Sequence, residues 1–150
     1  MNWTVIGIGN RFLSGDAAGI LVYQELQQRI LPDNVSLVEG GLMGLDLLPF
    51  LERGGGVIFV DVVSGFASES SIIVLNQEQI LCDIHEAYSH NTGLSYLLGV
   101  LPKVYEGELP EQILLIGIEG PLTPQLVIDA ANRVLAIVSE DVGTCQRNSI

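Results

Sequence analysis

The segment Val57-Ile58-Phe59-Val60-Asp61 places four apolar side chains in a row directly before a carboxylate. A continuous apolar run of this length is typical of a β-strand that is covered on both faces, as in a parallel sheet between helices. A carboxylate behind such a strand is costly to bury without a partner. The segment therefore indicates a class of fold and a first candidate site residue, Asp61.

Apolar runs alternate with helical patterns along the rest of the chain. Strands are predicted over residues 3–8, 35–38, 57–60, 70–75 and 113–118, and helices over about 16–30, 45–51, 93–104 and from Thr123-Pro124 onwards. Alternation of this kind produces βαβ units with right-handed crossovers. We therefore expect an α/β three-layer sandwich with a mostly parallel, about five-stranded twisted sheet flanked by helices.

Length and charge limit the classes of function. The chain has 150 residues, of which 48% are hydrophobic, and this size predicts a single domain over residues 1–150. It carries 18 acidic and 6 basic residues, a net charge of -12, so nucleic acid and membrane surfaces are not expected as partners. The absence of an N-terminal signal pattern and the presence of only two cysteines favour the cytoplasm.

Three polar residues follow predicted strands or precede a predicted helix. Asp16 follows the first strand, Asp61 stands at the tip of the third, and His90 comes just before the helix predicted near residue 93. Ligands of open α/β sheets bind outside the carboxyl ends of the strands. Two carboxylates and one imidazole suit Ni, Zn, Mn or Fe and leave coordination positions for water or substrate. The sequence therefore offers a candidate metal site.

Two of these three assignments, Asp16 and His90, have a structural alternative. An acid at the start of a helix often serves as an N-cap, which would explain Asp16, and His90 would also suit a helix cap. Cys82-x-x-His85 is a second candidate metal pair because this spacing occurs in zinc sites. A closed zinc site needs four ligands, however, and the sequence offers no second cysteine pair beside it.

A dinucleotide-binding fingerprint is partly present. Gly7-Ile8-Gly9 begins the pattern, and Glu39, after the second strand, stands where a ribose-binding acid belongs. Phe12 replaces the third glycine, and Asp16 would put negative charge where the helix N-terminus binds a pyrophosphate. A nucleotide-binding oxidoreductase is therefore retained as an alternative function.

Several groups of residues follow one another in a characteristic order and spacing between Trp3 and about Val138. They are Gly7-Ile8-Gly9-Asn10 with Leu13, Asp16 and Gly19; Glu39-Gly40-Gly41 with Gly44-Leu45-Asp46-Leu47-Leu48; Val57-Ile58-Phe59-Val60-Asp61; His90-x-x-Gly93-Leu94; and Ile116-Gly117-Ile118 with Leu122-Thr123-Pro124. Together they resemble the hydrogenase maturation endopeptidases, which process the large subunit of NiFe hydrogenases.

The resemblance implies a specific reaction and specific roles. Members of the family cut a short C-terminal extension from the large-subunit precursor after nickel has been inserted, and they recognise that nickel. The resemblance assigns the nickel contacts to Asp16, Asp61 and His90, and it assigns cleavage or recognition to Glu39 together with Asp16. Nickel would be carried by the precursor, and no organic cofactor is implied.

The sequence also departs from the family pattern. Gly15 stands where the family usually has an acid, Leu42 stands where it usually has threonine, and the loop at Glu119-Gly120-Pro121 looks shortened. These differences bear on the exact substrate more than on the reaction. Neither a His-Glu-x-x-His nor a Gly-x-Ser-x-Gly pattern is present, so other common hydrolase mechanisms have no local support. A non-catalytic nickel-binding or peptide-binding adaptor on the same fold is a further alternative.

Overall fold

The structure is a computed structural model and describes residues 1–10, 12, 15, 17–41, 45–65, 71–82 and 92–148. Strands and helices alternate through most of this part of the chain. In order, the elements are β1 (Trp3–Ile8), α1 (Ala18–Gln27), β2 (Val35–Gly41), the 3₁₀ helix η2 (Leu45–Leu47), α2 (Leu48–Leu51), β3 (Gly56–Val63), β4 (Ser71–Asn76), α3 (Gln77–Cys82), α4 (Thr92–Val104), β5 (Gln112–Glu119) and α5 (Pro124–Asn148).

The strands form one five-stranded sheet in the order β2-β1-β3-β5-β4. Every neighbouring pair is parallel except β4 with β5, which is antiparallel. The predicted α/β class with a mostly parallel sheet is confirmed. Because the chain moves from β1 to β2 on one side and returns to β3 on the other, the order of strands reverses between β1 and β3. This reversal is where ligands bind in open α/β sheets.

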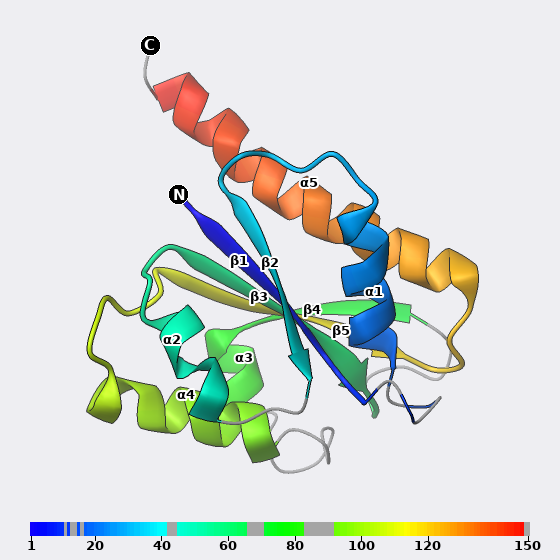
Figure 1. Cartoon of the computed structure of the whole chain (residues 1–150), viewed down its shortest axis with the longest axis horizontal. Coiled ribbons are helices and arrows are strands. Elements are labelled where there is room, and N and C mark those ends of the chain that lie inside the picture. Colours follow the sequence, from blue (N-terminus) through cyan, green and yellow to red (C-terminus); the bar gives the residue numbers. More distant parts are fainter. Residues whose placement is uncertain are drawn as a thin grey trace.

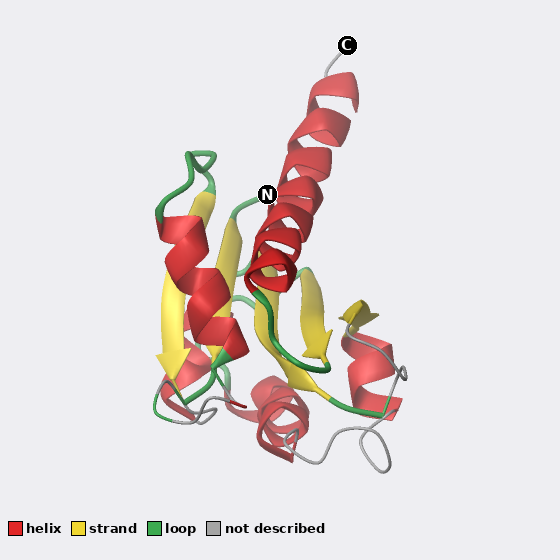
Figure 2. Cartoon of the chain, turned by 90° about the vertical axis from the view of Figure 1, so that its right-hand side faces the viewer, coloured by secondary structure: helices red, strands yellow, loops and turns green. Residues whose placement is uncertain are grey.

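Helices cover both faces of the sheet (Figure 1). Side chains of α1 and α5 pack on one face, against residues such as Val5, Ile58 and Ile116. Side chains of α2, α3 and α4 pack on the other face, against residues such as Phe59 and Leu115. We call these the α1 face and the α4 face. Helix α5 extends well beyond the end of the sheet (Figure 2).

Three strands are longer than the sequence predicted, and β5 exceeds its predicted range by one residue at each end. Strand β2 continues through Glu39 to Gly41, and β3 continues through Asp61 to Val63. The extra residues find partners on neighbouring strands, since Glu39 is in register with Gly7 and Asp61 is in register with Gly117. The prediction that Asp61 stands at the tip of its strand is therefore wrong by two residues, because the ladder with β5 continues past the apolar run.

Helix α3 was missed by the sequence interpretation, although its start carries a recognisable signal. The backbone N–H of Gln79 donates to Asn76 Oδ1 at 2.9 Å, and the backbone N–H of Asn76 donates to Gln79 Oε1 at 2.9 Å. This reciprocal pair is a capping box, which satisfies two of the N–H groups left without partners at a helix start. The spacing Asn-x-x-Gln thus marks where β4 turns into α3.

The last helix begins as predicted. The backbone N–H of Leu126 donates to Thr123 Oγ1 at 3.1 Å, and Pro124 occupies the first helical position. This arrangement confirms Thr123 as the N-cap of α5.

Close contact between β1 and α1 depends on two glycines. A Cβ atom on Gly19 would overlap the carbonyl oxygens of Ile8 and Val60, and one on Gly7 would overlap the carbonyl oxygen of Gly19. Phe12, which stands at the third position of the dinucleotide fingerprint, is 87% exposed. The close approach that the fingerprint assigns to its third glycine is therefore provided here by Gly7 and Gly19.

Among the residues that the structure describes, no helix combines the length and apolar character that crossing a bilayer would take.

Candidate active site at the carboxyl edge of the sheet

Asp61 lies beside the reversal point between β1 and β3. Phe59 and Val63, two residues before and two residues after Asp61, both pack on the α4 face. Because side chains alternate along a strand, Asp61 also faces α4. The residue is only 5% exposed. Its Oδ1 atom accepts a hydrogen bond from the backbone N–H of Val62 at 2.7 Å. A carboxylate held in this way is shielded from bulk water and positioned by the backbone.

The other two predicted metal ligands, Asp16 and His90, lie outside the described residues. The same holds for His85 of the Cys82-x-x-His85 pair. Within the described part of the chain, no three His, Cys, Asp or Glu residues are grouped so that they could hold a metal ion. The proposed set of Asp16, Asp61 and His90 is therefore a prediction that this structure does not test.

Glu39 lies on the opposite side of the sheet from Asp61. Glu39 is in register with Gly7, whose Cβ position points at α1. Leu37, two residues before Glu39 on the same strand, packs on the α1 face. Glu39 therefore faces α1, and it is exposed. The structure thus places the two predicted site residues that it describes at the same edge of the sheet but on different faces.

A second buried carboxylate was not singled out from the sequence. Glu119 is the last residue of β5 and is 6% exposed, so among the described residues it and Asp61 are the only buried carboxylates. It is in register with Val63, whose side chain lies over Gly117. All of these positions belong to the α4 face, because Leu115 of the same strand packs there. The pattern that could have revealed Glu119 is an acid directly behind the apolar run of β5.

Ser71 completes a polar group on three adjacent strands. It is the first residue of β4 and lies directly opposite Glu119 in the antiparallel pair. Opposed residues in such a pair share one face of the sheet. The Oγ atom of Ser71 is buried and has no hydrogen-bond partner within the described structure. Since buried hydroxyl groups nearly always have a partner, this atom indicates a position for a water molecule or another polar group.

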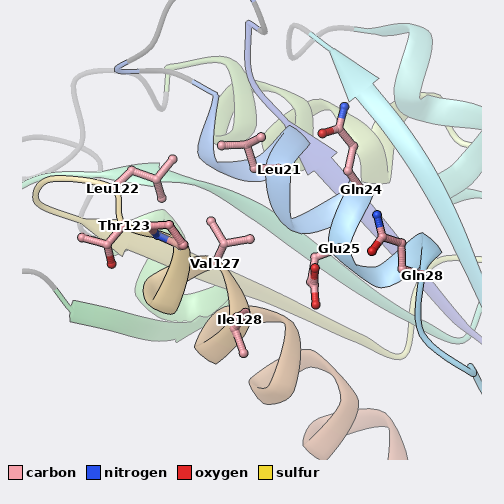
Figure 3. A pocket seen from close by; sticks show the side chains of 9 residues that line it. Leu21, Gln24, Glu25, Gln28, Leu122, Thr123, Val127 and Ile128 are labelled. Atoms are coloured by element: carbon pink, nitrogen blue, oxygen red, sulfur yellow. The ribbon is translucent and has the colours of Figure 1, made fainter.

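Two hollows lie on the α1 side of this edge. The smaller one, of about 110 Å³, is lined by Gly15, Ala18, Val62, Ile118, Gly120, Pro121 and Leu122. The larger one, of about 430 Å³, is a groove in which side chains of α1 face those of α5 (Figure 3). Its walls include Leu21 and Gln24 on α1 and Val127 on α5. Both hollows are lined by Leu122, so they adjoin one another.

Fold and site together define an α/β protein whose buried carboxylates lie at the carboxyl edge of a mostly parallel sheet, beside the reversal of strand order. Residues 20–145 match the family model described as hydrogenase maturation protease. The chain therefore belongs to the hydrogenase maturation protease family and is a peptidase. The matched region includes Glu39, Asp61, His90 and Glu119, and it begins after Asp16.

Individual relatives agree with this assignment. The chain is 31% identical over 121 residues to the Hydrogenase 2 maturation protease of Escherichia coli K12, covering 79% of this chain and 73% of that protein. It is 27% identical over 149 residues to the hydrogenase expression/formation protein HupD of Bradyrhizobium diazoefficiens, covering 88% of this chain and 77% of the relative. The predicted family is confirmed.

Solved structures show the same fold. The hydrogenase maturating endopeptidase HybD from E. coli superposes with a TM-score of 0.78 at 28% identity, covering 94% of each chain. A hydrogenase maturation protease from Thermococcus kodakarensis, at 21% identity, has a TM-score of 0.66 over 93% of this chain and 90% of its own length, and it supports the fold alone. The family membership favours the peptidase hypothesis over the nucleotide-binding oxidoreductase.

Proposed function

We propose that this endopeptidase removes a C-terminal extension from the nickel-loaded large-subunit precursor of a NiFe hydrogenase. Membership of the maturation protease family supplies the class of reaction and the kind of partner. The observation that carries the proposal within this chain is Asp61, a buried carboxylate held by a backbone N–H beside the reversal of strand order. A carboxylate in that position lies at the edge of the sheet where ligands of open α/β sheets bind.

Nickel enters this proposal as part of the substrate. Asp16, Asp61 and His90 would complete the coordination of an ion that the precursor already holds, so that only a loaded precursor would be seated for cleavage. Gly15, which precedes Asp16 in sequence, lines the same small hollow as Val62, which follows Asp61. Val62 faces α1 whereas Asp61 faces α4, so this contact brings the residue before Asp16 to the edge of the sheet at which Asp61 lies, on the α1 side.

The cleavage step needs a group that takes a proton from the attacking water. Glu39 and Asp16 are the carboxylates that the family resemblance assigns to cleavage or recognition. Glu39 is exposed on the α1 face, whereas Asp61 faces α4, so the roles of the two acids can be tested separately by substitution. Glu39→Gln would lower processing if the carboxylate serves cleavage and would leave the maximal rate unchanged if it serves recognition alone.

The decisive experiment mixes the purified protein with nickel-loaded and nickel-free precursors and follows the precursor by intact-protein mass spectrometry. A mass loss in the loaded precursor alone supports the proposal. Equal trimming of both precursors would contradict the role of nickel, and a nickel-dependent complex whose mass never changes would support the adaptor alternative instead.

A single variant tests the ligand assignment. His90→Ala is expected to abolish processing without unfolding the protein, because the substitution removes the imidazole that is proposed to contact nickel. Circular dichroism would verify folding. Normal trimming by this variant would refute the assignment of His90.

A further inference from the structure

We propose that Glu119 is a catalytic residue of this peptidase and holds the water molecule that attacks the scissile peptide bond. The inference rests on the proposed function for its substrate but not for its geometry. Glu119 is 6% exposed, ends β5, and shares the α4 face of the sheet with Asp61 on the adjacent strand. A carboxylate buried at this edge of the sheet is shielded from bulk water and lies where ligands of open α/β sheets bind.

The register of the sheet gives the spacing between the two carboxylates. Asp61 is opposite Gly117, and Glu119 is two residues further along the same strand. With strands about 4.8 Å apart and a rise of about 3.3 Å per residue, the two Cα atoms are separated by roughly 8 Å. Gly117 carries no side chain, and the side chain of Val63 lies over it, between the two acids. A precursor segment that crosses Val63 would therefore reach both a group held at Asp61 and a water molecule held at Glu119.

Ser71 provides an independent observation that points to a position for a polar group here. Its Oγ atom is buried without a hydrogen-bond partner in the described structure, and it lies directly across the antiparallel pair from Glu119. Opposed side chains in such a pair have Cβ atoms about 4.5–5.5 Å apart. One water molecule between Ser71 and Glu119 would satisfy the hydroxyl group and be oriented by two partners.

Glu119 suits this role better than Glu39. Both residues are near the carboxyl edge, but Glu39 is exposed and faces α1, whereas Glu119 is buried and faces the same side as Asp61. Electrostatic and proton-transfer effects are stronger where bulk water is excluded. The side of the sheet therefore distinguishes the two acids.

The chemical step balances as an ordinary amide hydrolysis. The Glu119 carboxylate accepts a proton from water while the water oxygen bonds to the scissile carbonyl carbon. The same proton then passes to the amide nitrogen as the carbon–nitrogen bond breaks, which releases the extension with a free amine and leaves a new carboxylate on the large subunit. The step consumes one water molecule and requires no oxidant or reductant.

The test compares Glu119→Gln with Glu111→Gln on nickel-loaded precursor. Glu111 precedes the amino end of the same strand and is exposed, so it is a matched control for the same substitution. Glu119→Gln is expected to lower kcat by about 100-fold or more, as for loss of a general base, with KM changed less than about threefold. Glu111→Gln is expected to behave as the parent protein.

Ser71→Ala gives a second measure. Losing one hydrogen bond to the water is expected to lower kcat a few-fold to about tenfold. If Glu119→Gln melts below the assay temperature, the Ser71→Ala variant decides, and an unchanged kcat there overturns the proposal. Parental kcat in a folded Glu119→Gln variant also overturns it.

The outcome for Glu119 is separable from that of the proposed function. If the parent protein trims the nickel-loaded precursor and Glu119→Gln binds it without trimming, both proposals stand. If the parent trims and Glu119→Gln trims equally, only the role of Glu119 fails. If the parent does not trim this precursor at all, the proposed substrate fails, and the same kcat comparison is made on whichever precursor the parent cleaves.

Discussion

Gly7 of β1 and Gly19 of α1 lie so close together that a Cβ atom on Gly7 would overlap the carbonyl oxygen of Gly19. This contact brings α1 against the central strands near their carboxyl ends. Because the atoms that a Cβ would meet belong to the backbone, they cannot move aside as a flexible side chain would. The two glycines therefore fix how α1 is seated on the sheet.

Gly19→Ala is expected to destabilise the protein despite the better helix propensity of alanine. The new methyl group would overlap the carbonyl oxygens of Ile8 and Val60, and overpacking of this kind costs about 1–3 kcal/mol. A thermal melt followed by circular dichroism should show a fall of several degrees in Tm.

Gly99→Ala is the matched control for that prediction. Gly99 lies within α4, is exposed, and has no atom within 4 Å of its Cβ position. Alanine there should raise the free energy of unfolding by about 0.5–1 kcal/mol, because a glycine inside a helix is replaced. Equal effects of the two substitutions would contradict the packing role of Gly19.

Asp61→Asn should separate the site from the fold. The amide oxygen of asparagine can still accept the hydrogen bond from the backbone N–H of Val62, so Tm should change little. Processing of nickel-loaded precursor should fall by more than about 100-fold, which exceeds the loss typical of a residue that only supports a metal ligand. Precursor mass measured against time gives the rate.

The control for Asp61 is Asp46→Asn. Asp46 lies in the 3₁₀ helix η2 and is exposed, so its substitution should alter neither Tm nor rate. If Asp61→Asn retained the parental rate while Asp46→Asn did the same, Asp61 would have no part in catalysis or recognition.

Thr123→Ala should weaken the start of α5. It removes the hydroxyl group that accepts from the backbone N–H of Leu126, and losing such an N-cap costs about 1 kcal/mol. Thr123→Ser keeps the hydroxyl group and should preserve most of the stability. Urea unfolding of the two variants provides the comparison, and equal midpoints would argue against the cap.

Asn76→Ala and Gln79→Ala should each destabilise the protein and should not add when combined. The two side chains bond reciprocally to one another's backbone N–H groups across the start of α3. Residues that act in one network give non-additive free energies of unfolding in a double-mutant cycle. Simple additivity in that cycle would show that the two bonds act independently.

Apolar patterning was sufficient to predict the class of fold. The run in β3 and those in β1 and β5 are apolar except for Thr4 of β1, because these strands are covered on both faces. Burial of this kind is visible in the local composition of the sequence. The start of α5 at Thr123-Pro124 was also predictable, because its N-cap depends only on residues close together in sequence. Strand ends were less predictable, since Glu39 and Asp61 stay in the sheet through partners on β1 and β5 that are distant in sequence.

The sequence by itself determined the family, the α/β class and the candidate acid Asp61, because each of these depends on residue types and spacing along the chain. Only the tertiary structure decided which acids share a face. Strand pleating sends Asp61 and Glu119 toward α4 and Glu39 toward α1, and the register of β3, β5 and β4 brings Ser71 opposite Glu119. Register arises from pairing between remote segments, so no local pattern encodes it.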